Sequence, residues 1–164
     1  MTTHHFGLFV RVIGGAIRPA SEDEVITAAR NMLDAKIQRQ GNISSPADSK
    51  AFVALRLGAL PYEVFAVIFV DAQHRVIAYR EMFRGTLTQT SVYPREVVKE
   101  ALTLNAAAVL LSHNHPSGVP EPSRADEYLT STLKSALALV DVRVLDHLIV
   151  AGGQVLSFAE RGLL

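Results

Sequence analysis

The chain has 164 residues, of which 49% are hydrophobic and 20% are charged, so it can bury the core of one globular domain. Its 16 basic and 16 acidic residues cancel, which argues against a general nucleic-acid-binding protein, because such proteins usually carry a basic excess. Cysteine is absent, which excludes disulfides and thiolate metal sites, so any metal must be held by histidine, carboxylates or water.

The sequence offers no sign of membrane insertion or secretion. No apolar run approaches the roughly 20 residues that a transmembrane helix needs. The apolar patch near the N-terminus is interrupted by Arg11 and is not preceded by a basic segment, so it does not resemble a signal peptide. We therefore expect a cytoplasmic protein.

The first 42 residues predict a short extension. Residues 7–13, GLFVRVI, fit a short edge strand. Residues 21–40 fit a helix, in which Ser21 is a good N-cap and Glu24, three residues later, completes a capping box. We therefore separate an N-terminal extension, residues 1–42, from the rest of the chain.

The main domain, residues 43–164, is predicted to begin with a joint and a helix. Ser45 is a suitable N-cap, Pro46 suits the first helical position, and the helix should end near Gly58. Residues 63–84 then fit two strands around a tight turn. The first of these strands is apolar on both faces, which is typical of a central strand.

Helices and strands alternate in the second half of the chain. The predicted order is a helix, a buried strand, a second helix and a hairpin with two glycines at its turn. This alternation predicts an α/β domain with a mixed β-sheet flanked by helices. The four segments are residues 91–106, 107–112, 122–140 and 142–158.

A group of polar residues follows the buried strand. Side chains at positions i and i+2 of an extended segment point the same way, so His113 and His115 should converge just beyond the strand predicted at 107–112. The next helix begins near Ser123 and brings Asp126 back in its first turn. Two imidazoles and a carboxylate suit Zn²⁺ with a fourth position open to water, whose pKa such a site lowers to about 7.

Hydrolysis at such a site also needs a base and a donor for the developing oxyanion. Ser123, in the loop, is the candidate donor. Glu63 is the best candidate base, because it opens a buried strand and shares a face with Phe65, Val67 and Phe69. A charged residue at the start of so apolar a strand is unusual, which suggests that it has a function.

Each of these residues also has a purely structural interpretation. Ser123 and Asp126 fit the capping-box pattern, which alone would account for both. An isolated His-x-His pair often has no function. Glu63 could be the solvated end of its strand.

Three further pairs of polar residues allow two interpretations each. Asp146 and His147 either support a metal-bound histidine from behind or form a hydrogen-bonded pair in the core. The other two pairs either contact a substrate or serve only as turn-forming and solvated residues. They are Asn114 with Ser117 and Arg84 with Arg95.

The spacing His-x-His, seven residues, Ser, two residues, Asp, with a Glu on an earlier strand, resembles the JAMM motif of the MPN (JAB) domain metalloproteases. The string HNHPSGVPEPSRAD, residues 113–126, resembles the RadC branch of that group in particular. So do the strings EVFAVIFVDAQHRVI, SVYPREVVKEAL and LNAAAVLLSHNHPSG. The resemblance covers about residues 43–164.

The resemblance implies a cytidine-deaminase-like α/β fold and one Zn²⁺ per chain on His113, His115 and Asp126. It assigns Glu63 as the general base and Ser123 as the oxyanion stabiliser. It further implies hydrolysis of a peptide or isopeptide amide bond, since the broad family often acts at the C-terminal tails of ubiquitin-like proteins. We therefore expect a zinc metallopeptidase.

A binding function is the alternative. RadC-like proteins are traditionally assigned to DNA repair, and longer members carry an N-terminal helix-hairpin-helix region. Residues 1–42 are too short for that region, and the net charge of the chain is zero. The alternative interpretation is a DNA- or partner-binding module in which zinc is structural or vestigial.

Overall fold

The computed structural model describes residues 8–12, 14–40, 45–85 and 91–164. Its main body is a five-stranded sheet in the order β4-β3-β5-β6-β7. β5 and β6 are parallel, and the other neighbouring pairs are antiparallel. The predicted mixed sheet is thus confirmed. Its strands are β3 (Val64–Val70), β4 (Val76–Arg84), β5 (Ala108–Asn114), β6 (Arg143–Ala151) and β7 (Gln154–Ser157).

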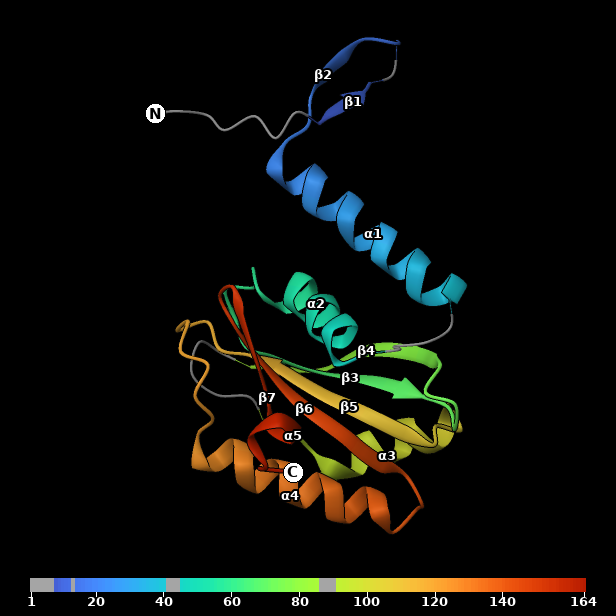
Figure 1. Cartoon of the computed structure of the whole chain (residues 1–164), viewed down its shortest axis with the longest axis vertical. Helices are drawn as coiled ribbons and strands as arrows, with labels where there is room; N and C mark the ends of the chain where they lie inside the picture. Colours follow the sequence, from blue (N-terminus) through green and yellow to red (C-terminus); the bar gives the residue numbers. More distant parts are fainter. Residues whose placement is uncertain (1–7, 13, 41–44, 86–90) are drawn as a thin grey trace.

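Helices cover both faces of this sheet, as predicted. The helix that follows the joint at Ser45 lies on the upper face in Figure 1, and the helices that come after it in the sequence lie below the sheet. Ser45 caps the upper helix by accepting a hydrogen bond from the Asp48 amide, and Pro46 occupies its first turn, which confirms both predictions. The short last helix was not predicted. The helices are α2 (Pro46–Leu57), α3 (Pro94–Thr103), α4 (Arg124–Ala138) and α5 (Phe158–Arg161).

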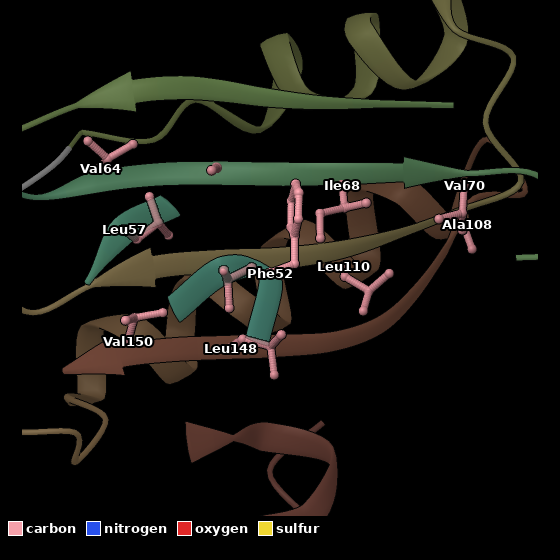
Figure 2. Close-up of a cluster of buried hydrophobic side chains, with 11 residues drawn as sticks. Phe52, Leu57, Val64, Ile68, Val70, Ala108, Leu110, Leu148 and Val150 are labelled. Carbon is pink, nitrogen blue, oxygen red and sulfur yellow. The ribbon is translucent and has the colours of Figure 1, made fainter. Parts of the chain in front are cut away.

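The side chains of the sheet alternate between two apolar clusters. Phe52 and Leu57 of α2 pack on the upper face against residues such as Ile68 and Leu148 (Figure 2). The lower face packs against α3 and α4 through another cluster, which includes Leu111. Every residue of β3 is buried, so its prediction as a central strand is confirmed.

The N-terminal segment forms a hairpin apart from the main sheet. β1 (Phe9–Arg11) pairs with β2 (Ile17–Pro19), and α1 (Glu22–Gln40) follows. The prediction of a single edge strand missed β2. The capping box at the start of α1 is confirmed, because Ser21 and Glu24 exchange hydrogen bonds. None of the described helices is long and apolar enough to cross a membrane.

Two strand boundaries differ from the predictions in a way that bears on the site. β5 was expected to end at residue 112, but it continues through Asn114, so His113 lies inside the strand. The extension follows from pairing, because His113 and Asn114 match Ile149 and Val150 on β6. β3 begins at Val64, one residue after the predicted start at Glu63.

Candidate metal centre

Three predicted ligands come together where β5 runs into α4. His113 and His115 project from the end of β5, and Asp126 lies in the first turn of α4, so the intervening loop (orange in Figure 1) closes the site. Their ligand atoms all lie within 4.8 Å of one another. Asp126 Oδ1 lies 3.3 Å from His113 Nε2, and Asp126 Oδ2 lies 3.6 Å from His115 Nε2.

A backbone contact sets the protonation of His115. Its Nδ1 lies 2.8 Å from the carbonyl oxygen of Val119 and must donate there, because a carbonyl oxygen only accepts. In the neutral ring Nε2 then carries the lone pair. This nitrogen faces Asp126 and is free to bind a metal ion.

A chain of hydrogen bonds sets the protonation of His113. The Thr130 hydroxyl donates to the Asp126 carbonyl oxygen at 2.6 Å, so Thr130 Oγ1 accepts from Nδ1 of His147, also at 2.6 Å. Nε2 of His147 must then accept from Nδ1 of His113, at 2.8 Å. The lone pair of His113 is therefore on Nε2, which points at the same place as that of His115.

Two aromatic rings fix the orientation of these imidazoles. Phe65 of β3 stacks on His113 with an interplanar angle of 16° and meets His147 edge-on. The ring of Phe158 lies 4.8 Å from that of His147. Since His113 is only 2% exposed and His147 is fully buried, neither ring can easily turn away.

The charges at the site favour a cation. Partial burial would raise the pKa of Asp126. When a proton takes the place of a metal ion on Nε2 of His113 or His115, its hydrogen bond to Asp126 holds that pKa far below its usual range, so the carboxylate is ionised. The pKa of His115 is raised, mainly by its hydrogen bond with Asp126 and in part by the negative charge of Glu63. Burial lowers the pKa of His147 well below its usual value, which keeps the ring neutral.

Ser123 and Asp126 form a complete capping box. The Asp126 amide donates to Ser123 Oγ at 3.2 Å, and Asp126 Oδ2 accepts from the Ser123 amide and hydroxyl at 2.7 and 2.6 Å. The structural interpretation of this pair is therefore correct. It leaves a metal role open, because Oδ1 of Asp126 is not used by the cap.

The site forms the floor of a cavity of about 620 Å³. Glu63 lines this cavity together with the three predicted ligands and Ser123, so all five predicted site residues meet in one place. The β3–β5 register explains the position of Glu63. Phe65 pairs with His113 at the end of the ladder, and Glu63 and His115 each lie two residues beyond that pair, at the same end of the two strands. The other walls are mainly apolar, formed by Phe65, Val92, Pro94 and Leu129.

The remaining residues that the sequence left with two interpretations differ in their contacts. Asp146 accepts from the His147 backbone amide at 2.7 Å and from Ser157 Oγ at 2.5 Å, so Asp146 and His147 are hydrogen-bonded in the core. The imidazole of His147 also contacts His113 from behind, as the other interpretation predicted. Ser117 lines the cavity. The Arg84 guanidinium lies 3.6 Å above the Tyr62 ring, and the Arg95 side chain is 87% exposed.

The sequence did not point to Thr130, and it did not predict the contacts that Asn114 makes. Thr130 completes the hydrogen-bond chain behind His113, and no motif marked it. Its position four residues after Asp126 is a signal only in retrospect, since this spacing puts both on one helix face. Asn114 makes buried contacts outside the cavity, at the start of β3.

The donor set fits zinc. Two imidazole nitrogens and one carboxylate oxygen are ligands that Zn²⁺ prefers, and an open side toward the cavity suits a catalytic rather than a closed structural site. Nε2 of His113 and Nε2 of His115 lie 2.9 Å apart. In the neutral tautomers derived above, both carry lone pairs, so no hydrogen joins them and a shared cation satisfies both.

Comparison with known proteins identifies similar chains. A family model described as RadC-like JAB domain matches residues 43–163. The UPF0758 protein of Leptothrix cholodnii is 60% identical over 149 residues, which cover 89% of this chain and 67% of that protein. The UPF0758 protein of Variovorax paradoxus is 56% identical over 155 residues, covering 94% and 69%. These names specify no reaction, so the geometry of the site carries the argument on function.

Proposed function

This chain belongs to the RadC-like JAB domain family, and from that premise we propose that it is a zinc-dependent hydrolase that cleaves a peptide or isopeptide amide bond. One observation carries the proposal. Three metal-binding groups with their lone pairs directed at one point share a cavity with the carboxylate of Glu63. A structural metal site would not require a carboxylate facing it across an open cavity.

In this proposal each of the three predicted ligands contributes one atom to the coordination of a single ion. His113 and His115 each offer Nε2, and Asp126 offers Oδ1 while its Oδ2 accepts from Ser123. A zinc ion bound there supplies a Lewis acid and makes a water molecule reactive near neutral pH. The hydrogen bonds to Val119 and His147 keep both imidazoles in the tautomer that binds a metal.

Glu63 is proposed as the general base and acid. Its carboxylate takes a proton from the attacking water and delivers it to the leaving nitrogen, which would otherwise depart as an unstable anion. Its place directly before β3, in the lining of the cavity that the predicted ligands share, supports this role.

Ser123 is proposed to have two successive roles. In the structure its hydroxyl donates to Asp126 Oδ2, which orients that carboxylate. Rotation about the Cβ–Oγ bond redirects the hydroxyl proton into the cavity, where it can stabilise a developing oxyanion. The Ser123 amide continues to hold Asp126 Oδ2 after this rotation.

Metal content and hydrolysis test the proposal together. Tag-free wild type purified with zinc in excess should contain about one zinc per chain, whereas His115→Ala should contain almost none. Glu63→Gln should keep its zinc and lose about 10²- to 10⁴-fold in the rate of peptide or isopeptide hydrolysis. Zinc is measured by elemental analysis, and hydrolysis is measured on a panel of both substrate types.

His74→Ala is the matched control, because His74 is an exposed histidine in the turn between β3 and β4. It should retain both zinc and activity. A metal-free wild type would contradict the zinc site. A fully active Glu63→Gln variant would leave the zinc site in place and remove Glu63 from the base role.

A further inference from the structure

Asn114 stands between the two histidines in sequence but faces away from them. Successive residues of a strand point to opposite faces, so Asn114 projects from β5 on the side opposite His113 and His115. It is only 2% exposed. A buried amide side chain must find several hydrogen-bond partners, and its partners show what it does.

The side chain of Asn114 binds the backbone on both sides of Glu63. Its Oδ1 accepts from the Val64 amide at 2.8 Å, and its Nδ2 donates to the Tyr62 carbonyl oxygen at 2.9 Å. A weaker contact of 3.4 Å joins Nδ2 to the carbonyl oxygen of Leu60. Glu63 is thus bracketed by two short hydrogen bonds to one side chain.

The bracket lies where the regular structure ends. The β3–β5 ladder runs only as far as Phe65 and His113, and Glu63 lies outside β3. Beyond this point the Asn114 side chain, in place of the β5 backbone, makes the hydrogen bonds to the chain that leads into β3. The Glu63 carbonyl oxygen accepts from the Gly85 amide at 2.9 Å, which ties the same residue to the end of β4.

The contacts require an amide and account for all of its groups. Oδ1 faces an N–H group and Nδ2 faces two carbonyl oxygens, so Asn114 acts as acceptor and donor together. An ionised Asp could not donate to the carbonyls, and a Ser or Thr has a single proton to donate. These contacts replace both earlier interpretations, substrate contact and turn formation.

We propose that Asn114 is a positioning residue for Glu63, which it holds at the mouth of the cavity by its backbone. The inference rests on the proposed role of Glu63 as the base. It assigns two tasks to the three residues His-Asn-His: the outer pair faces the metal centre, and the central residue fixes the carboxylate that works with it. A misplacement of the order of 1 Å can cost a large factor in rate, so such a bracket has a direct consequence for catalysis.

Two measurements test this inference without an identified substrate. Amide hydrogen exchange of Val64, followed by NMR on the zinc-loaded protein, reports the bracket itself. The pH midpoint of the visible absorption of Co²⁺-loaded protein reports the surroundings of the metal. Glu63→Gln calibrates this midpoint, because it removes the negative charge of the carboxylate and keeps the length of the side chain.

Asn114→Ala should keep its Co²⁺, increase the exchange rate of the Val64 amide by roughly 2- to 10-fold, and move the midpoint in the direction seen for Glu63→Gln. Asn114→Asp is a second variant in case the first fails to fold. It is nearly isosteric and retains an acceptor for Val64, so it should shift the midpoint through loss of the donor to Tyr62.

Ser112→Ala is the matched control, because Ser112 is buried on the same face of β5 and also bonds to the β3 backbone, at the Ala66 carbonyl oxygen. It should leave the midpoint and the Val64 exchange rate unchanged. The inference would be overturned if Glu63→Gln shifts the pH midpoint of the Co²⁺ absorption and Asn114→Ala has the same midpoint as wild type. No shift in Glu63→Gln would instead overturn the proposed base and the inference with it.

Discussion

His147 shows how a single buried residue can control a site that it does not enter. It is completely buried, and its lowered pKa keeps the ring neutral. Because Thr130 fixes the proton on Nδ1 of His147, Nε2 of that ring can only accept from His113. The tautomer of His113, a predicted metal ligand, is therefore decided by a hydroxyl group on α4.

Removing this support should weaken metal binding without removing a ligand. We expect His147→Leu to reduce zinc affinity by about 10- to 100-fold, because His113 loses the acceptor that fixes its ring and its tautomer. Competition with a chromophoric chelator measures the affinity. Thr130→Ser keeps the hydroxyl and should bind zinc as wild type does. An unchanged affinity in His147→Leu would show that the stacking of Phe65 is enough to orient His113.

At the scale of elements, the start of α4 serves the fold and the site with the same residues. Ser45 and Ser123 cap α2 and α4 with equal geometry, since each accepts from an amide three residues later at 3.2 Å. The two caps differ in surroundings, because only Ser123 also holds a predicted ligand, Asp126. Substituting each serine in turn therefore separates the effect of a lost helix cap on stability from the effect of Ser123 on zinc binding.

Ser45→Ala and Ser123→Ala should each lower the free energy of unfolding of the metal-free protein by about 0.5–2 kcal/mol. Urea denaturation measures this change. Only Ser123→Ala should also weaken zinc binding, because Asp126 Oδ2 loses one of its two donors. Equal zinc affinity in the two variants would show that the Ser123 amide alone is enough to hold the carboxylate.

At the scale of the whole molecule, the candidate metal centre brings the predicted ligands on β5 and α4 together with Glu63, which comes from a much earlier part of the chain. The sheet is covered on both faces, and the site lies where β5 meets β3 and α4. An ion bound by both β5 and α4 has no comparable site in the unfolded chain. Zinc binding should therefore stabilise the whole fold.

Zinc should raise the melting temperature of wild type, and this gain should shrink as the pH falls below neutral. A metal ion needs the deprotonated His115 ring, and the raised pKa of His115 lets protons compete at a higher pH than for an ordinary histidine. In the metal-free protein the same raised pKa acts oppositely, because it favours the folded state at low pH. Thermal melts with zinc or chelator at several pH values measure both effects.

Asp126→Ala is the control for these melts and should show no gain from zinc at any pH. A zinc-dependent gain of equal size at low and neutral pH would contradict the participation of His115. A gain that persists in Asp126→Ala would place the ion elsewhere on the chain.

Local patterns were sufficient for most of the fold and for part of the site. The caps at Ser21 and Ser45 and the buried run of β3 depend on neighbouring residues, so they were predictable. The i, i+2 spacing of His113 and His115 likewise predicted their convergence. The end of β5 was misplaced because its last residues are polar, and only pairing with β6 keeps them in the strand.

Composition, periodicity and capping thus determined the α/β class, most element boundaries and the candidate ligands, because each depends on residues close together in the chain. The partners of Asn114 lie about 50 residues away, and His147 reaches His113 across 34. Such contacts depend on strand register and on which face each residue occupies. Only the packed sheet settles these. The bracket around Glu63 and the part of Thr130 behind His147 therefore emerged from the tertiary structure alone, whereas support of a histidine by His147 was one of two interpretations of the sequence.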